Sequence, residues 1–152
     1  MRFNNILLPF DGSIPSKRAA EYAIHIATLE NSTLFFIHIL DSIKQGGAIG
    51  LRARYGDIDL VEGFKKARMR EAEEWLKPVQ QESNNKGIKS KVEILEDEGS
   101  SKLEIITDYI KNNSIDIVVM GSRGLSKFKQ LLLGSTAYGI ISHSTCPVLI
   151  IR

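Results

Sequence analysis

A glycine-rich motif in the last third of the chain carries the residues best suited to chemistry, which are Gly121-Ser122-Arg123-Gly124 and, after nine further residues, Gly134-Ser135-Thr136. The motif begins where an apolar run, 115–120, ends, and it leads into a helix-like segment, 135–142. Glycine lets the backbone approach an anion without a Cβ in the way. The first amides of a helix lack intrahelical partners and lie at the positive end of its dipole. Strand, loop and helix start together predict a phosphate-holding turn, and therefore a nucleotide ligand.

Several members of this motif also fit an ordinary structural role. Ser135 and Thr136 would serve equally as a plain helix cap, and the stretch as a whole fits a surface loop that ends in a Gly-Ser-Thr cap. Arg123 is placed either to reach a phosphate or to lie on the surface, and Ser122 is the weaker candidate. The cap role and the anion role are compatible, so the phosphate-binding prediction stands beside the structural alternative.

A second candidate group follows an apolar strand near the start of the chain, where 3–9 leads into Pro9-Phe10-Asp11-Gly12-Ser13. A carboxylate at the end of a strand can accept a hydrogen bond from a ribose hydroxyl or hold a metal-bound water. Asp-Gly-Ser is also a common turn sequence, in which Asp11 would only shape the turn. Pro9 would shape the strand exit, and Ser13 would cap the first helix, with Pro15 in its opening turn.

Strand-like and helix-like patterns alternate along the chain. Five strands are predicted at 3–9, 33–40, 90–95, 115–120 and 148–151, and four helices at 15–29, 60–84, 101–112 and 135–142. The strand at 90–95 alternates in polarity and is expected at a sheet edge. Pro78 lies inside the second helix and is expected to kink it or end it early. Apolar strands that alternate with helices predict a single-domain α/β fold, a doubly wound parallel sheet with helices on both faces.

Four motifs that occur in order resemble the universal stress protein family, in its ATP-binding branch. They are Pro9-Phe10-Asp11, His38-Ile39-Leu40-Asp41, the glycine motif, and the closing run Cys146-Pro147-Val148-Leu149-Ile150-Ile151. The resemblance runs from end to end, over residues 1–152. It implies the strand order 3-2-1-4-5, in which the tips of the first and fourth strands, with Asp11 and Gly121, meet at one crevice.

The resemblance also implies which residues meet an adenine nucleotide, that is ATP, ADP or AMP, with Mg²⁺. Ile39 matches a position whose backbone meets the adenine edge, and Met120 matches a pocket-lining position, although both would otherwise be ordinary core residues. The full expected binding set is Pro9, Asp11, Ile39, Met120, Gly121, Arg123, Gly124, Gly134, Ser135 and Thr136.

The other candidate side chains are assigned to structure. No catalytic residue and no protein metal site is predicted, because His25 and His143 have no partner at metal-ligand spacing. His38 is interpreted as a structural strand residue, and Cys146 as a small apolar filler. Gly139 weakens the last helix by about 1 kcal/mol relative to alanine, which puts the rigidity of that helix in doubt.

The resemblance implies an ATP-binding regulatory protein of the stress response, a nucleotide-dependent switch that forms a homodimer through the strand 148–151. The alternative is a slow ATP hydrolase or nucleotidyl transferase that uses the same pocket. No Gly-x4-Gly-Lys-Ser/Thr loop is present, and Asp11 is the one obvious base beside the phosphate-holding turn. A third hypothesis is a dimeric interaction protein that has lost its ligand. The intact motif argues against it, because the sequence shows no structural reason for three spaced glycines.

Composition narrows the class of protein. Hydrophobic content of 43% and charged content of 25% are ordinary for a soluble globular chain, and a net charge of +2 is too small to indicate nucleic acid. One cysteine excludes an internal disulfide, and no segment approaches the ~20 apolar residues of a membrane span, so a cytoplasmic protein without a membrane partner is expected. The glycine-rich segment 41–59 is expected to fold over the ligand as a lid, or to recruit an unidentified protein partner through Arg52 and Arg54.

Overall fold

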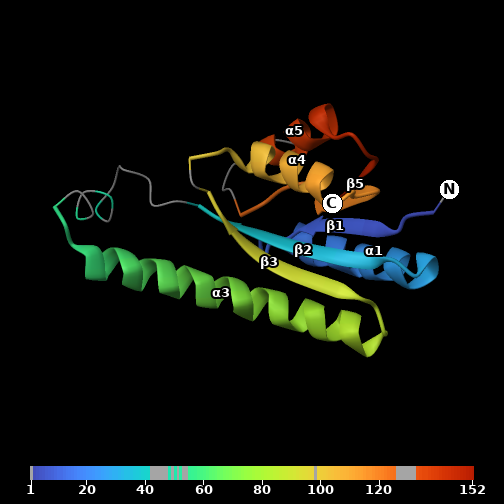
Figure 1. Ribbon diagram of the computed structural model, residues 1–152, viewed down its shortest axis with the longest axis horizontal. Coiled ribbons are helices and arrows are strands. Elements are labelled where there is room, and N and C mark those ends of the chain that lie inside the picture. Colours follow the sequence, from blue (N-terminus) through green and yellow to red (C-terminus); the bar gives the residue numbers. More distant parts are fainter. Residues whose placement is uncertain are drawn as a thin grey trace.

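The computed structural model describes residues 2–41, 48, 50, 52, 55–97, 99–125 and 133–152, and it shows an α/β fold (Figure 1). Its strands form one parallel sheet in the order β3-β2-β1-β4-β5, which confirms the predicted fold class and strand order. The strands are β1 (Asn5–Pro9), β2 (Thr33–Leu40), β3 (Ser90–Glu96), β4 (Ile117–Gly121) and β5 (Val148–Ile151). The helices are α1 (Ile14–Glu30), α3 (Ile58–Asn85), α4 (Lys102–Asn112) and α5 (Ser135–His143).

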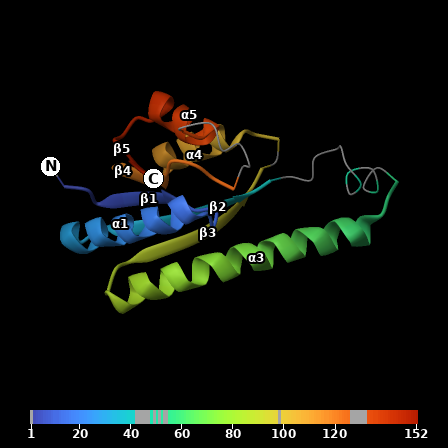
Figure 2. The same cartoon turned by 180° about the vertical axis from the view of Figure 1, so that it is seen from behind.

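Helices cover both faces of the sheet, and each face has its own apolar core (Figures 1 and 2). Neighbouring residues of one strand point to opposite faces, so a strand that is buried on both sides must be apolar at every position. Leu8 and Phe36 pack toward α1 and α3, whereas Leu7 and Phe35 pack toward α4 and α5. This two-sided burial explains why the strand sequences read as continuous apolar runs.

The strand order reverses at β1, which pairs with β2 on one side and with β4 on the other. The register aligns Leu7 with Val118, so that β1 and β4 end side by side, at Pro9 and Gly121. In open parallel sheets, ligands bind at the carboxyl ends of the strands where the order reverses. The fold therefore places the Asp11 turn and the glycine motif at the same edge of the sheet.

Helix α3 is longer than predicted, and the prediction that Pro78 would end it early is wrong, because the helix continues to Asn85. Proline removes one backbone donor and disturbs the carbonyl four residues earlier, which belongs to the exposed Glu74 and can be solvated. Leu76 and Ser83 are buried on either side of Pro78 and anchor the helix. The first half of α3 extends beyond the strand ends (Figure 1). Within the described residues, no helix is both long and apolar enough to cross a membrane.

The start of α1 follows the predicted capping. Ser13 caps α1 by accepting a hydrogen bond from the Ser16 amide, with Pro15 in the first turn, as predicted. The glycine that is expected to weaken the last helix, Gly139, lies where that helix packs against α4. A Cβ on Gly139 would lie 2.9 Å from a methyl carbon of Leu103, so glycine lets the two helices approach closely. Gly139 therefore serves the close contact between α5 and α4, and α5 continues through it.

Candidate functional site

A cavity of about 630 Å³ opens at the carboxyl ends of the central strands. It draws on β1, β2 and β4, on the start of α5, and on one face of α3. All ten residues of the expected binding set line it, namely Pro9, Asp11, Ile39, Met120, Gly121, Arg123, Gly124, Gly134, Ser135 and Thr136. The structure thus brings together segments that are more than a hundred residues apart in the sequence.

The start of α5 lines the cavity. Its N-cap is Gly134, with φ −70° and ψ 154°, and no side chain caps the helix. The alternative that Ser135 or Thr136 is a plain cap is therefore wrong, because both residues lie inside the first turn. The Gly134 amide donates a hydrogen bond to the Ser122 carbonyl at 2.8 Å, which fixes the helix start against the glycine motif. First-turn amides without a cap, at the positive end of a helix dipole, suit an anion.

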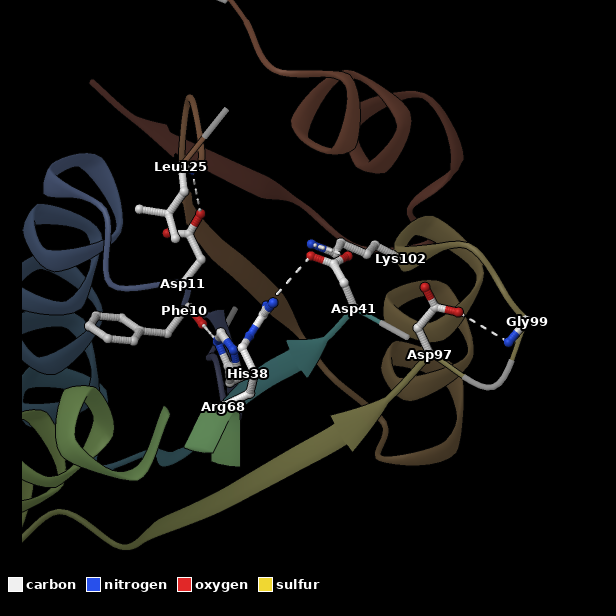
Figure 3. A network of polar contacts seen from close by, with 9 residues as sticks. All are labelled: Phe10, Asp11, His38, Asp41, Arg68, Asp97, Gly99, Lys102 and Leu125. Carbon is white, nitrogen blue, oxygen red and sulfur yellow. Dashed lines mark hydrogen bonds and ion pairs between the residues drawn. The ribbon is translucent and has the colours of Figure 1, made fainter. Parts of the chain in front are cut away.

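Asp11 ties the turn after β1 to the glycine motif. Its Oδ1 accepts a hydrogen bond from the Ser13 amide at 3.0 Å, and its Oδ2 accepts one from the Leu125 amide at 3.2 Å (Figure 3). A Cβ on Gly124 would lie 2.5 Å from that Oδ2. The turn-forming role considered for Asp11 is thus real. A carboxylate has about four lone-pair sites, so it retains the capacity to accept a further hydrogen bond from a ligand.

The structure supplies packing reasons for two of the three motif glycines, which corrects the view that nothing structural demands them. A Cβ on Gly121 would lie 2.8 Å from the carbonyl carbon of Pro15 and 2.9 Å from the amide nitrogen of Ser16. The tip of β4 therefore packs directly on the first turn of α1. Gly124 has no room because of Asp11. Gly134 differs, since its nearest neighbour would be the Ser122 carbonyl oxygen at 3.4 Å, an ordinary contact distance.

The backbone of Ile39 forms an open edge in the cavity wall. The Ile37 carbonyl accepts a hydrogen bond from the Phe10 amide on the β1 side, whereas the Leu40 carbonyl accepts from Asp97 on the β3 side. Because peptide groups alternate in direction along a strand, the N–H and C=O of Ile39 point to the β1 side. There β1 has already ended at Pro9. The Ile39 and Met120 side chains are only 8% and 6% exposed, so both serve the core as well as the cavity wall.

The sequence did not indicate a charged cluster that lines the same cavity. Asp41 at the end of β2 contacts Lys102 of α4 at 2.8 Å and Arg68 of α3 at 3.9 Å (Figure 3). Trp75, seven residues after Arg68 and on the same face of α3, also lines the cavity. Helical periodicity alone could have paired these two side chains, but it could not show that their face of α3 looks into the crevice.

His38 lies between the Asp11 turn and α3. It is buried, its Nδ1 lies 2.7 Å from the Phe10 carbonyl oxygen, and its ring meets the Trp75 ring edge-on at 5.6 Å. Because a carbonyl oxygen only accepts, Nδ1 must carry a proton. Burial lowers the pKa of the His38 imidazole, with smaller contributions in the same direction from the charges of Lys102 and Arg68. The hydrogen bond to Phe10 and the charge of Asp11 oppose the shift.

The comparisons with known proteins agree with this geometry. The model of the Universal stress protein family matches residues 2–152. The chain belongs to the universal stress protein family.

Individual members of the family match over nearly the whole chain. Universal stress protein MJ0531 of Methanocaldococcus jannaschii is 32% identical over 150 residues, which cover 99% of this chain and 82% of the relative. The structure of universal stress protein UspA from Lactobacillus plantarum superposes with a TM-score of 0.74 and 26% identity, over 100% of this chain and 99% of that one. A universal stress protein from Archaeoglobus fulgidus, solved in complex with dAMP, shares the fold with a TM-score of 0.66 at 17% identity. The match covers 99% of this chain and 98% of that one.

The buried His38 is expected to make stability depend on pH. Because its pKa is lowered in the folded state, the unfolded chain binds more protons once the pH falls below about 6.5, and the free energy of unfolding then decreases. We expect His38→Gln to remove this part of the pH dependence between about pH 7.5 and 5.5. Urea unfolding at a series of pH values measures it. Parallel curves for the wild type and the variant would contradict the assignment.

Two further expectations from the sequence concern metal binding and the segment 41–59. Among the described residues, no group of three or more His, Cys, Asp or Glu side chains could hold a metal ion. Arg52 is exposed and pairs with Asp57 at 3.3 Å. Arg54 and most of the segment lie outside the described residues, so the predictions of a lid and of a partner site there stay predictions.

Proposed function

We propose that this universal stress protein is a regulatory protein that holds an adenine nucleotide in the crevice between β1 and β4. The observation that carries the proposal is one cavity that is lined both by the uncapped start of α5 and by Ile39, whose backbone edge is open. The helix start suits phosphates. The dAMP complex of the Archaeoglobus fulgidus protein, which has the same fold, supports an adenine nucleotide as the ligand.

The backbone edge of Ile39 gives a physical reason for preferring adenine to guanine. The N–H can donate to N1 of adenine, and the C=O can accept from its 6-amino group. Guanine carries a hydrogen on N1 and an oxygen at position 6, so the same edge would oppose donor to donor and acceptor to acceptor. A site built to pair with a polar edge rejects a mismatched one strongly, because the buried groups are left unpaired.

The remaining residues have complementary roles in the proposal. Asp11 accepts a hydrogen bond from a ribose hydroxyl, and Arg123 lies where it can reach a phosphate, at the cavity wall. The Ser135 and Thr136 hydroxyls add donors beside the first-turn amides of α5. Mg²⁺ would enter with the phosphates, since it is usually held by one or two carboxylates together with phosphate oxygens and water, and Asp11 is the carboxylate nearest the glycine motif.

The geometry favours retention of the nucleotide over its hydrolysis. Among the described residues that line the cavity, the carboxylates are those of Asp11 and Asp41. Asp11 already accepts two backbone hydrogen bonds, and Asp41 is paired with two cations. Both carboxylates thus already serve as hydrogen-bond acceptors or ion-pair partners, roles that compete with service as the general base of phosphoryl transfer. The bound nucleotide therefore acts as the signal of a switch, in a protein of the stress response.

The proposed switch is a homodimer that pairs through β5. This strand forms one edge of the sheet, and three of its four residues, Val148, Leu149 and Ile150, are apolar and only partly buried. An apolar edge strand needs covering, and a second copy of the strand would supply the missing ladder of hydrogen bonds. Sedimentation equilibrium gives the mass; a monomer at micromolar concentration would exclude this part of the proposal.

Two measurements test the binding function. Nucleotide released by denaturing freshly purified protein is identified by mass spectrometry, and calorimetry then measures ATP, ADP, AMP and GTP binding. We expect one adenine nucleotide per chain, with GTP at least about tenfold weaker, and stabilisation by ~2.7 kcal/mol at 100 times Kd. Equal affinity for GTP would overturn the adenine assignment. If no nucleotide is released and Mg-ATP does not raise the melting temperature, the glycine motif and the start of α5 do not form a phosphate site.

A further inference from the structure

Trp75 of α3 packs on the turn that carries Asp11, and we propose that it is a positioning residue for the nucleotide site. This inference rests on the proposed function, because it concerns how the same site is held in its binding form. Trp75 is the single tryptophan of the chain and lines the cavity from the α3 side. Its indole lies between α3 and the turn after β1, so it links a helix to the backbone of the site.

The contact between Trp75 and Gly12 is close enough to fix the turn. A Cβ on Gly12 would lie 2.7, 2.8 and 3.1 Å from three atoms of the indole ring, so the ring occupies the space that any other residue would need. Gly12 has a φ of +78°, a conformation that L side chains rarely adopt. The ring thus lies directly against a stretch of backbone that only glycine can provide.

The same turn is also hydrogen-bonded to the segment of the glycine motif, 123–125. Asp11 accepts from the Ser13 and Leu125 amides, and the Ser13 hydroxyl donates to the Arg123 carbonyl at 3.3 Å. The Asp11 turn is therefore held both by the indole and by residues 123–125. If the ring is removed, the turn loses one of these supports, and the Asp11 carboxylate is free to leave the position in which it faces the ligand.

The indole also contacts a second residue of the site, His38. Its ring meets the ring of His38 at 78°, and His38 is bonded to the Phe10 carbonyl next to Asp11. Trp75 therefore acts on the site through the backbone of the turn, and this role predicts that its effect on nucleotide affinity depends on Asp11.

A double-mutant cycle on nucleotide affinity tests this dependence. ATP binding is measured by calorimetry for the wild type, Trp75→Ala, Asp11→Ala and the double variant. We expect each single variant to bind at least about tenfold more weakly, and the double variant to bind no more than about threefold more weakly than Asp11→Ala, because residues that act through one another are not additive. Trp75→Phe, which keeps a flat apolar ring, should restore affinity to within about threefold of the wild type.

The controls separate positioning from a general loss of packing. Val79→Ala removes apolar contact from the next turn of α3, at a residue that packs on the core without lining the cavity. It should lower stability without lowering affinity. Trp75→Leu repeats the cycle if Trp75→Ala does not fold. Additive losses, or a loss in Val79→Ala equal to that in Trp75→Ala, would overturn the inference while nucleotide binding by the wild type stands. A wild type that does not bind ATP would overturn the proposed function and this inference together.

Discussion

Replacing Gly134 by aspartate is expected to weaken adenine nucleotide binding at least about a hundredfold, a loss of ~2.7 kcal/mol, while leaving the protein as stable as the wild type. The backbone at this N-cap position is extended, and a Cβ would meet its nearest neighbour at 3.4 Å, an ordinary contact distance. Aspartate is a favourable N-cap, whose carboxylate binds the first-turn amides and complements the helix dipole. It therefore occupies the donors that the phosphates need, and it places a negative charge beside them.

The matched control is Gly134→Asn, which has the same shape and caps the helix equally well but carries no charge. We expect it to weaken binding by about tenfold, since it competes for the amides without repelling the phosphates. The difference in nucleotide affinity between the aspartate and asparagine variants should become smaller as the salt concentration is raised, because screening weakens repulsion between charges. Calorimetry at two salt concentrations and urea unfolding provide the data. If the aspartate variant binds as tightly as the wild type, the phosphates do not lie at the start of α5.

The sheet was predictable because its information is local and repetitive. The inner strands are apolar runs, the edge strand 90–95 alternates in polarity, and every connection contains a helical pattern, so the parallel sheet follows from chain order and from the handedness of crossovers. One of the two effects expected of Pro78, an early end of the helix, was wrong because it depends on tertiary packing. Its local effect is unfavourable, but the burial of Leu76 and Ser83 on both sides of it holds the helix, and burial depends on the tertiary structure.

Only part of the site could be predicted from the sequence. The ten expected residues gather in one cavity because each lies near the end of a strand, in the loop after it, or at the start of a helix, at the same edge of the sheet. Residues contributed by a helix face were missed, namely Arg68 and Trp75 of α3 and Lys102 of α4, with their partner Asp41. A helix pattern shows which side chains share a face, but the orientation of that face toward a cavity follows only from packing.

The three glycines of the motif show the same limit of prediction from sequence, because their surroundings differ only in the folded structure. In the sequence, Gly121, Gly124 and Gly134 form one pattern with one apparent purpose. In the structure, Gly121 is confined by the backbone of α1, Gly124 by the Asp11 carboxylate, and Gly134 by nothing closer than 3.4 Å. Spacing in sequence cannot separate a glycine that ligand approach requires from one that packing requires. Substitution by alanine, position by position, can separate them.

Gly121→Ala is accordingly expected to lower the free energy of unfolding by about 1 to 3 kcal/mol, which is the usual cost of overpacking. The added methyl group would meet the backbone of Pro15 and Ser16 at 2.8 to 2.9 Å, and backbone cannot move aside as the end of a side chain can. Since each kcal/mol corresponds to roughly 2 to 4 °C at this chain length, thermal unfolding resolves the effect.

Gly134→Ala carries the same substitution at the less crowded position of the motif, and it should lower the free energy of unfolding by less than about 1 kcal/mol, the usual cost of a weaker N-cap.

Nucleotide affinity measured per folded molecule tests the role of Gly121 independently of stability. If Gly121 serves the packing of β4 on α1, the fraction of Gly121→Ala that remains folded should bind nucleotide within about threefold of the wild type, because the phosphate donors of α5 are untouched. Full stability combined with lost binding would instead mean that Gly121 meets the ligand directly and that the contact with Pro15 yields without cost.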